Sequence, residues 1–401
     1  MAEIGQPAGQ QFYCIVKIRN SQLNASNINY LIIREWVFNI LPTLELQFYD
    51  SGYLTEISPL EDGEDIEVTI SKNEDSDEII SLVFSFDDME MGLIGDNRKT
   101  IITLTGHLKV DYNMFTLQTR SFARQTSKSV LQQIATESGI EFTNPRNIKP
   151  SDNMTWFQSN SSNFDFIKHV IKRAYIPKDV IFLYGDTRNK FVFTSLLAEM
   201  GKKESKITKF SVENTESSVR NENDKDNTIW FASYDIVNYS GFYNKKSSYG
   251  VSYTYYDLKD NAVTESYTDI NKLTDLSFRN RKGVSKNGVY IDYVGDYFDN
   301  NIYGYQYFES KIRNPMLKNN FFANSLNINV NSLSKVYLFD TIEIQIPSLF
   351  GEGEVNEPLS GEYLVGGIQH EISQGNIYRK KVSIHRNGMN KNSNYKLYEV
   401  E

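Results

Sequence analysis

A short strand pattern occurs twice in this chain of 401 residues, and it restricts the folds that the chain can adopt. Ile66–Ile70 (IEVTI) and Ile342–Ile346 (IEIQI) alternate apolar and polar residues, and an acidic residue, Asp65 or Asp340, precedes each. Alternation with a period of two indicates a strand with one buried and one solvated face. A segment with two predicted helices separates the copies. The resulting order is β module, small α/β module, β module, which favours a structural component over a catalyst.

The first module is predicted to consist almost wholly of strands. Short apolar segments are separated by turn sequences rich in Asp, Gly and Asn, whose backbones and side chains suit tight turns. Many short strands with regular turns are typical of a barrel or a sandwich. The predicted strands are Phe12–Ile18, Leu31–Ile40, Leu44–Tyr49, Ile66–Ile70, Ile79–Phe86 and Ile101–Val110.

The texture of the sequence changes near Phe115, where an α/β unit is predicted to begin. Thr126 or Ser127 is expected to cap a first helix, which Gly139 ends in the manner of a left-handed C-cap. Ser162 begins a second helix with a spacing like that of a capping box, and the helix ends before Pro177. The predicted strands of this unit are Phe115–Arg120, Val180–Tyr184 and Phe191–Thr194, the last two forming a hairpin.

The remaining sequence predicts a second β module that contains an insertion. Residues 245–309 are rich in tyrosine and irregular in pattern; they favour half-buried sheet tyrosines, with a glycan or protein contact surface as the alternative. The predicted strands are Ile229–Asn238, Leu326–Val330, Val336–Phe339, Thr341–Ile346, Gly361–Ile372 and Tyr378–Arg386.

These patterns predict a fold that is mainly β with α+β character. Two similar β-barrel (tube) domains are expected to flank a small α/β domain. The predicted domains are a first barrel at 1–112, the α/β domain at 113–205, a second barrel formed by 206–244 and 310–388, the insertion at 245–309 and a polar tail at 389–401.

Composition disfavours several classes of protein. The net charge of −9 is unfavourable for binding nucleic acid or anionic membranes. Cys14 is the one cysteine, so an internal disulfide framework is excluded and a buried core thiol is expected. The first residues have no basic region with a hydrophobic core, and no later stretch reaches 18 uncharged apolar residues. The sequence therefore predicts neither Sec-dependent export nor a membrane-spanning segment.

No catalytic residue, cofactor or metal site is predicted. The four histidines, His107, His169, His370 and His385, lack metal-ligand spacing, and the sequence contains no nucleophile elbow or phosphate-binding glycine loop. Asp165 and His169 lie one helical turn apart and could share a ligand, although a surface pair is favoured. The carboxylates of Glu352, Glu354 and Glu357 could bind calcium or form a glycosidase pair, although a solvated hairpin tip is favoured.

Three runs in the α/β unit carry a family resemblance: Thr119–Thr126, Glu137–Ile140 and Phe157–Ile167 (FQSNSSNFDFI). They resemble the tail-hub family of contractile injection machines, which includes the central baseplate hub of T4-like phages and the hub part of type VI secretion spike proteins. The matching motif positions are Gln158, Ser162, Asp165 and Phe166. Similar runs occur in both β modules, at Leu44–Ser51, Asp62–Ile66, Leu359–Val365 with Gly361 and Tyr363, His370–Ile372 and Lys381–Arg386.

The resemblance implies a homotrimer whose paired barrels alternate in a pseudo-sixfold ring around a channel. The implied partners are a spike protein, a tail tube or tube-initiator protein and baseplate wedge proteins, while DNA passes through without specific binding. The implied location is the tail baseplate of a virion, reached after synthesis in the host cytoplasm and without membrane insertion. Because the sequence lacks a glycine-punctuated β-helix repeat and a cell-wall hydrolase module, spike and enzyme are expected on separate chains.

Two other classes of protein remain open at this point. A glycan-binding or receptor-binding tail module would suit an acidic, aromatic, β-rich chain with 26 Tyr and 24 Phe. However, Trp36 and Trp156 lie within apolar predicted strands, which leaves few tryptophans for stacking on sugars. A glycoside hydrolase is the third class, because 51 carboxylates provide many chance pairs.

Overall fold

The structure is a computed structural model of the full chain. It describes residues 12–19, 21–50, 60–61, 63–72, 78–94, 99–200, 208–212, 228–238, 250–257, 262–269, 286–294, 304–322, 324–330, 336–346, 348, 355–374 and 377–386.

The fold is mainly β, and its largest element is a 13-stranded sheet with the order β19-β13-β14-β18-β21-β20-β3-β4-β7-β6-β5-β1-β2. One end of this order comes from the first β module. Its neighbouring strands pair antiparallel, and β1 and β4 alternate buried and partly buried residues along their whole lengths. The strands are β1 (Tyr13–Ile18), β2 (Ser21–Gln22), β3 (Ile28–Trp36), β4 (Thr43–Tyr49), β5 (Asp65–Ser71), β6 (Glu78–Ile94) and β7 (Lys99–Leu108), with a 3-10 turn at Ala25–Asn27.

The other end of the sheet comes from the second β module. Its strands are β13 (Thr208–Val212), β14 (Thr228–Asn238), β18 (Asn324–Val330), β19 (Thr341–Gln345), β20 (Gly361–Ser373) and β21 (Ile377–Arg386). β20 is long enough to pair with β19 near its start and with β3 of the first module near its end. The β3–β20 ladder, which runs from Trp36↔Gly367 to Tyr30↔Ser373, therefore makes the two β modules continuous.

The repeated strands are confirmed as half-buried strands. In β5 and β19 the isoleucines of the two echoes are buried, whereas Glu67, Glu343 and Gln345 are not. Their neighbours differ, because β5 lies between two antiparallel strands while β19 pairs parallel with β13 and antiparallel with β20. The alternation alone therefore predicts burial but not strand direction.

An α/β unit lies between the two modules in sequence. Its elements are a 3-10 turn at Tyr112–Met114, β8 (Leu117–Gln125), α2 (Ser127–Glu137), β9 (Glu141–Thr143), β10 (Met154–Ser162), α3 (Asn163–Arg173), β11 (Ile181–Gly185), β12 (Lys190–Ser195) and α4 (Leu196–Met200). Thr126 and Ser162 are the N-caps, as predicted. Gly139 has φ +68°, and the Ile140 N–H bonds the Ala135 carbonyl oxygen, so the predicted C-cap is also confirmed.

The insertion is more regular than the sequence indicates. A three-stranded sheet, β15 (Gly250–Asp257), β16 (Ala262–Asp269) and β17 (Lys286–Val294), precedes the helix α7 (Gly304–Phe321). The expectation that this segment forms sheet is confirmed for these three strands, whereas α7 is absent from the sequence prediction because Pro315 lies inside it. Pro disfavours helix in the residues before it. The burial of the insertion's tyrosines lies outside the described side chains.

Two further predictions are corrected. The predicted strand Leu31–Ile40 ends at Trp36 and is followed by a turn. The segment Val336–Phe339 forms a turn and not a strand, with Phe339 at φ +64°. The tail at 389–401 and Glu352 and Glu354 of the acidic loop lie outside the described residues.

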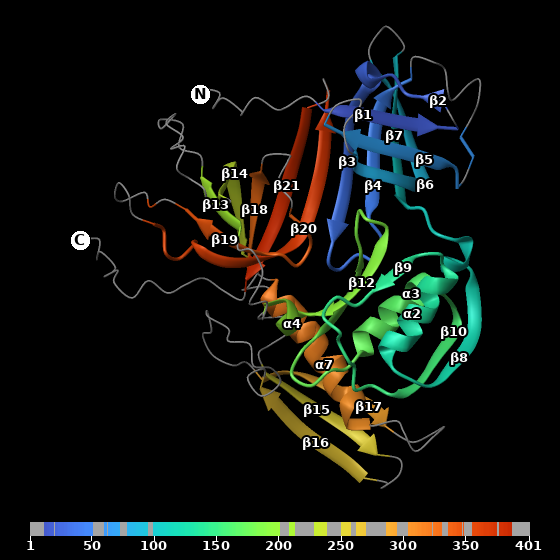
Figure 1. The fold of residues 1–401 in the computed structure, drawn as a ribbon. Helices are drawn as coiled ribbons and strands as arrows, with labels where there is room; N and C mark the ends of the chain where they lie inside the picture. Colours follow the sequence, from blue (N-terminus) through green and yellow to red (C-terminus); the bar gives the residue numbers. More distant parts are fainter. Residues whose placement is uncertain are drawn as a thin grey trace.

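The hairpin β11–β12 lies between two apolar cores and contributes side chains to both. On β11, Ile181 and Leu183 belong to the core of the first module and the α/β helices, whereas Phe182 and Tyr184 belong to the core of the second module. All five residues of β11 are buried, so both of its faces are covered. In Figure 1 the hairpin rises from the α/β unit toward the ends of β3 and β4. The strands β15 and β16 lie at the bottom of the view, at the other end of the molecule from the first β module. The hairpin therefore joins the α/β unit to both β modules.

Candidate functional site

Gln158, the first motif residue, lies in a buried polar cluster between β8, β10 and the start of α3. Its side-chain oxygen accepts a hydrogen bond from Arg120 Nε at 2.9 Å, and its amide donates to the Ser161 carbonyl oxygen at 2.8 Å. Arg120 also donates to Asn163 at 2.8 Å and pairs with Glu137 of α2 at 2.7 Å. The cluster satisfies buried polar groups and holds both helices to the β8–β10 ribbon.

Ser162, Asp165 and Phe166 form the first turn of α3. The Ser162 hydroxyl accepts the Asp165 N–H at 3.1 Å, as an N-cap does, and Phe166 stacks on Phe122 of β8 at a centroid distance of 5.7 Å. The predicted Asp165–His169 pair is wrong, because Asp165 binds Ser162 and Lys168 instead. These motif positions therefore position a helix and do not assemble a ligand site.

We expect Ser162→Ala to lower the free energy of unfolding by about 1 kcal/mol, because the Asp165 N–H loses its acceptor at the start of α3. Urea denaturation measures the change. Ser161→Ala is the matched control, because Ser161 directly precedes the cap and its hydroxyl does not accept an N–H of the first turn of α3. We expect it to change stability by less than about 0.5 kcal/mol. Equal losses in the two variants would contradict the capping role.

Gly361 and Tyr363, the motif residues of the second β module, lie at the start of β20. Gly361 has φ +117°, a backbone conformation that other residues rarely adopt. The Tyr363 hydroxyl donates to the Leu359 carbonyl oxygen at 2.7 Å, and the Arg386 guanidinium lies 4.5 Å from the Tyr363 ring centroid. Arg386 also donates to the Ser360 carbonyl oxygen at 3.0 Å. These contacts fix the turn that leads into β20, and they lie apart from the α3 motif.

The tip of the β11–β12 hairpin contacts both β modules. A Cβ added at Gly185 would lie 2.6 Å from the Ile40 carbonyl oxygen of the β3–β4 turn. Toward the second module, the rings of Phe182 and Tyr184 pack against the Phe339 ring, with centroid distances of 5.1 and 5.5 Å. Arg188 lies over the Tyr337 ring at 4.8 Å. The hairpin tip is therefore packed against both β modules at once.

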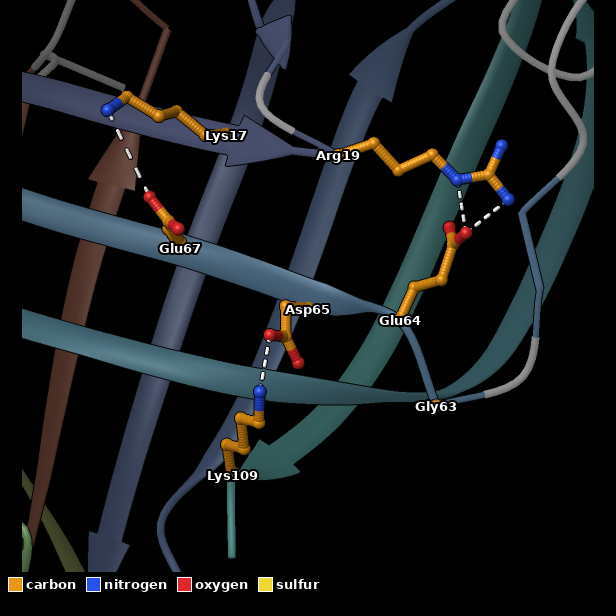
Figure 2. A pocket seen from close by; sticks show the side chains of 7 residues that line it. All are labelled: Lys17, Arg19, Gly63, Glu64, Asp65, Glu67 and Lys109. Carbon is orange, nitrogen blue, oxygen red and sulfur yellow. Dashed lines mark hydrogen bonds and ion pairs between the residues drawn. The ribbon is translucent and has the colours of Figure 1, made fainter.

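A shallow pocket of about 460 Å³ lies on the solvated face of the first module (Figure 2). Its side chains form three ion pairs, Lys17–Glu67, Arg19–Glu64 and Lys109–Asp65. Gly63, with φ +80°, lies in the turn just before Glu64 and β5. Three cations face three anions, so the pocket offers neither a net positive site for phosphate nor free carboxylates for a metal. The paired charges are those of a solvated sheet face.

The described residues contain no group of three or more histidine, cysteine or carboxylate side chains placed to hold a metal ion. Within the same residues no helix is long and apolar enough to cross a membrane. Cys14 is buried, as predicted, and burial raises the pKa of its thiol to about 12. The six motif positions lie at two separate places, around the start of α3 and at the start of β20.

Sequence reasoning missed a set of buried polar residues, Glu35, His370 and Lys380. A signal for them existed, because each replaces an apolar residue at a core-face position of an alternating strand. Glu35, for example, follows Leu31 and Ile33 and precedes Val37 at intervals of two, and all four are buried.

Comparison with solved structures gives two similar folds over nearly whole chains. A tail protein from Neisseria meningitidis has a TM-score of 0.59 at 8% identity, covering 94% of this chain and 98% of that one. The 43 kDa tail protein of prophage MuSo2 from Shewanella oneidensis has a TM-score of 0.57 at 11% identity, covering 94% and 100%. The chain therefore has the fold of these tail proteins.

A third solved structure is more distant. It is the Escherichia coli c3393 protein, a component of the type VI secretion system, with a TM-score of 0.49 at 8% identity and coverage of 94% of this chain and 79% of that one. No protein-family model and no curated protein sequence matches the chain. The similarity to tail proteins is therefore one of fold.

Proposed function

We propose that the chain is a structural hub component of a phage contractile tail or of a related injection machine. The observation that carries the proposal is the shared fold with two tail proteins over 94% of this chain. Further support comes from the motifs from Arg120 to Phe166 and from Gly361 to Tyr363, whose hydrogen bonds lie around the start of α3 and at the start of β20.

The proposed assembly is a homotrimer in which two barrel-like modules per subunit alternate in a pseudo-sixfold ring. Support comes from the second module, where strand pairing proceeds through β19, β13, β14, β18, β21 and β20 and then returns to β19. Further support is the β3–β20 ladder, which ties the two modules of one subunit together. In a ring, neighbouring subunits would also cover sheet edges that otherwise invite aggregation.

Within this proposal the domains keep the boundaries expected from the sequence, namely 1–112, 113–205, 206–244 with 310–388, 245–309 and 389–401. The spike protein would bind one side of the ring, and the tail tube or tube-initiator protein the other, with baseplate wedge proteins around it. DNA would pass through the channel without specific binding. The chain would be made in the host cytoplasm and act in the virion tail baseplate.

The proposed role is structural and not enzymatic. A glycan-binding module is the second candidate, but the described tryptophans give it little support. Trp36 packs against Gly367 and His385, and Trp156 is buried with its indole N–H bonded to the Gln125 carbonyl oxygen at 2.9 Å. Neither ring is presented as an open stacking platform.

Partner binding tests the proposal. We expect the full tagged chain to form a stable complex with the spike and tube proteins of the same tail, measured by co-purification and light scattering. Failure to bind either partner, together with saturable binding to a host polysaccharide, would replace the hub role with the glycan-binding one.

A further inference from the structure

Five residues with polar side chains converge at the place where the two β modules and the hairpin meet. Glu35 and His370 are 5% and 4% exposed, so both lie inside the protein. Charged groups lose hydration in such a place and persist when hydrogen bonds and opposite charges compensate them. The Glu35 junction is defined here as Glu35 of β3, Thr187 of the hairpin, His370 of β20, and Tyr378 and Lys380 of β21.

The Glu35 carboxylate accepts hydrogen bonds from both sides. Thr187 donates its N–H to Oε2 at 2.8 Å and its hydroxyl to Oε1 at 3.2 Å. His370 Nε2 lies 3.1 Å from Oε1, and His370 Nδ1 lies 2.5 Å from the Tyr378 hydroxyl oxygen. With the tyrosine hydroxyl donating to Nδ1, the neutral imidazole carries its proton on Nε2 and donates to Glu35.

Electrostatics keep this carboxylate charged. Burial alone would raise the pKa of Glu35, but the hydrogen bonds from His370 and from the Thr187 N–H and the charge of Lys380 hold it below its usual value. Burial lowers the pKa of His370, so the ring is neutral, and burial lowers the pKa of Lys380 to about 8.

Other titratable or charged groups surround the junction. They are Tyr184, Asp186 and Arg188 of the hairpin, Asp340 before β19 and Arg34 of β3, which pairs with Glu45.

The hairpin tip is closed by its own contacts. The Asp186 carboxylate accepts the N–H groups of Arg188 at 3.0 Å and Lys190 at 3.3 Å, and the Asp186 carbonyl oxygen accepts that of Asn189 at 3.0 Å. The β3–β20 ladder is likewise complete without the hairpin. Thr187 therefore links two preformed parts, and its bonds to Glu35 span 152 residues of sequence.

We propose that the Glu35 junction is a releasable joint: the charged carboxylate fastens the Thr187 turn to the continuous β sheet, and its neutralisation loosens that turn while the sheet and the apolar contacts of the hairpin stay in place. The joint is closed at neutral pH, where Glu35 is ionised. Protonation in acid, or an amide in place of the carboxylate, leaves one accepting oxygen for three donors and removes the charge opposite Lys380. The inference concerns the isolated chain and stands independently of the proposed function.

Hydrogen–deuterium exchange of the full chain at pH 7 tests the joint. In Glu35→Gln we expect the Thr187 amide, resolved within the peptide covering 185–190, to exchange at least tenfold faster than in the wild type, because Glu35 is its acceptor, while peptides of β5 and β6 exchange at unchanged rates. Glu45→Gln is the matched control, since Glu45 is a partly exposed carboxylate on the neighbouring strand, paired with Arg34 at 2.8 Å. We expect it to leave exchange at 185–190 unchanged.

The outcomes separate a joint from general stabilisation. Unchanged exchange at 185–190, or an equal increase in every peptide, would overturn the proposal. If Glu35→Gln fails to fold, Thr187→Ala decides, because it removes the hydroxyl bond and keeps the N–H bond. We expect a smaller increase confined to the same peptide, and no increase there would again overturn the joint.

Discussion

Gly185→Ala is expected to lower the free energy of unfolding by about 3 kcal/mol, the upper end of the cost of overpacking. A Cβ at this position would lie 2.6 Å from the Ile40 carbonyl oxygen and 3.1 Å from Pro42 Cδ. Because the closest atom is backbone, the hairpin must move away from the β3–β4 turn. Such a movement also disturbs Phe182 and Tyr184, which lie in the core of the second module.

Gly92→Ala is the control for this prediction. Its Cβ would meet Ile101 Cγ2 at 3.5 Å, an ordinary contact, and it lies on β6 away from the hairpin. We expect a change within about 0.5 kcal/mol in urea denaturation followed by tryptophan fluorescence. If both variants were equally stable, the tight approach of the hairpin to the first module would be incorrect.

Acid is expected to destabilise the protein through His385, which is buried between Trp36 and Phe322. Burial lowers the pKa of His385 to about 3. The unfolded chain takes up a proton near its ordinary pKa of about 6.5, whereas the folded chain does not, so stability is lost as the pH falls from about 6.5 toward 3. The expected loss from this residue between pH 7 and pH 5 is about 2 kcal/mol.

His385→Gln tests that contribution, because glutamine does not titrate in this range. We expect the variant to lose about 2 kcal/mol less than the wild type between pH 7 and pH 5, whatever its stability at pH 7. His370 also has a lowered pKa and contributes to the acid loss, but it does so equally in both proteins. Identical pH dependence of the two proteins in urea titrations would show that burial does not lower the pKa of His385 in the folded protein.

Local chemistry made part of the fold predictable. Thr126, Ser162 and Gly139 act through contacts within a few residues, so the sequence alone locates the ends of α2 and the start of α3. The alternation in β1, β4 and β5 likewise predicts the buried face, because the period of side chains along a strand is two.

Long-range pairing could not be predicted in the same way. The β3–β20 ladder joins residues more than 330 positions apart, and alternation defines the faces of each strand but not its partner. The helix α7 was not predicted because Pro315 lies inside it. In the structure Arg313 and Asn314 of this helix are buried, and the Asn314 side chain donates to the Ala174 carbonyl oxygen, just after α3, at 2.8 Å. Tertiary contacts of this kind override the local preference.

The candidate site shows the same division. The motif positions were found from sequence, but their roles depend on partners such as Arg120 and Asn163, which only the fold brings together. From the sequence, Glu35 can be recognised as a carboxylate at a core-face position of an alternating strand. Its partners Thr187 and His370 come from other modules, so the junction itself required the structure.

The native mass of the purified full chain, measured by light scattering alone and with the spike protein, and supported by negative-stain images, tests the central claim most directly. The hub account predicts three chains per particle and a ring with a central hole. A stable monomer under both conditions would contradict the proposed ring.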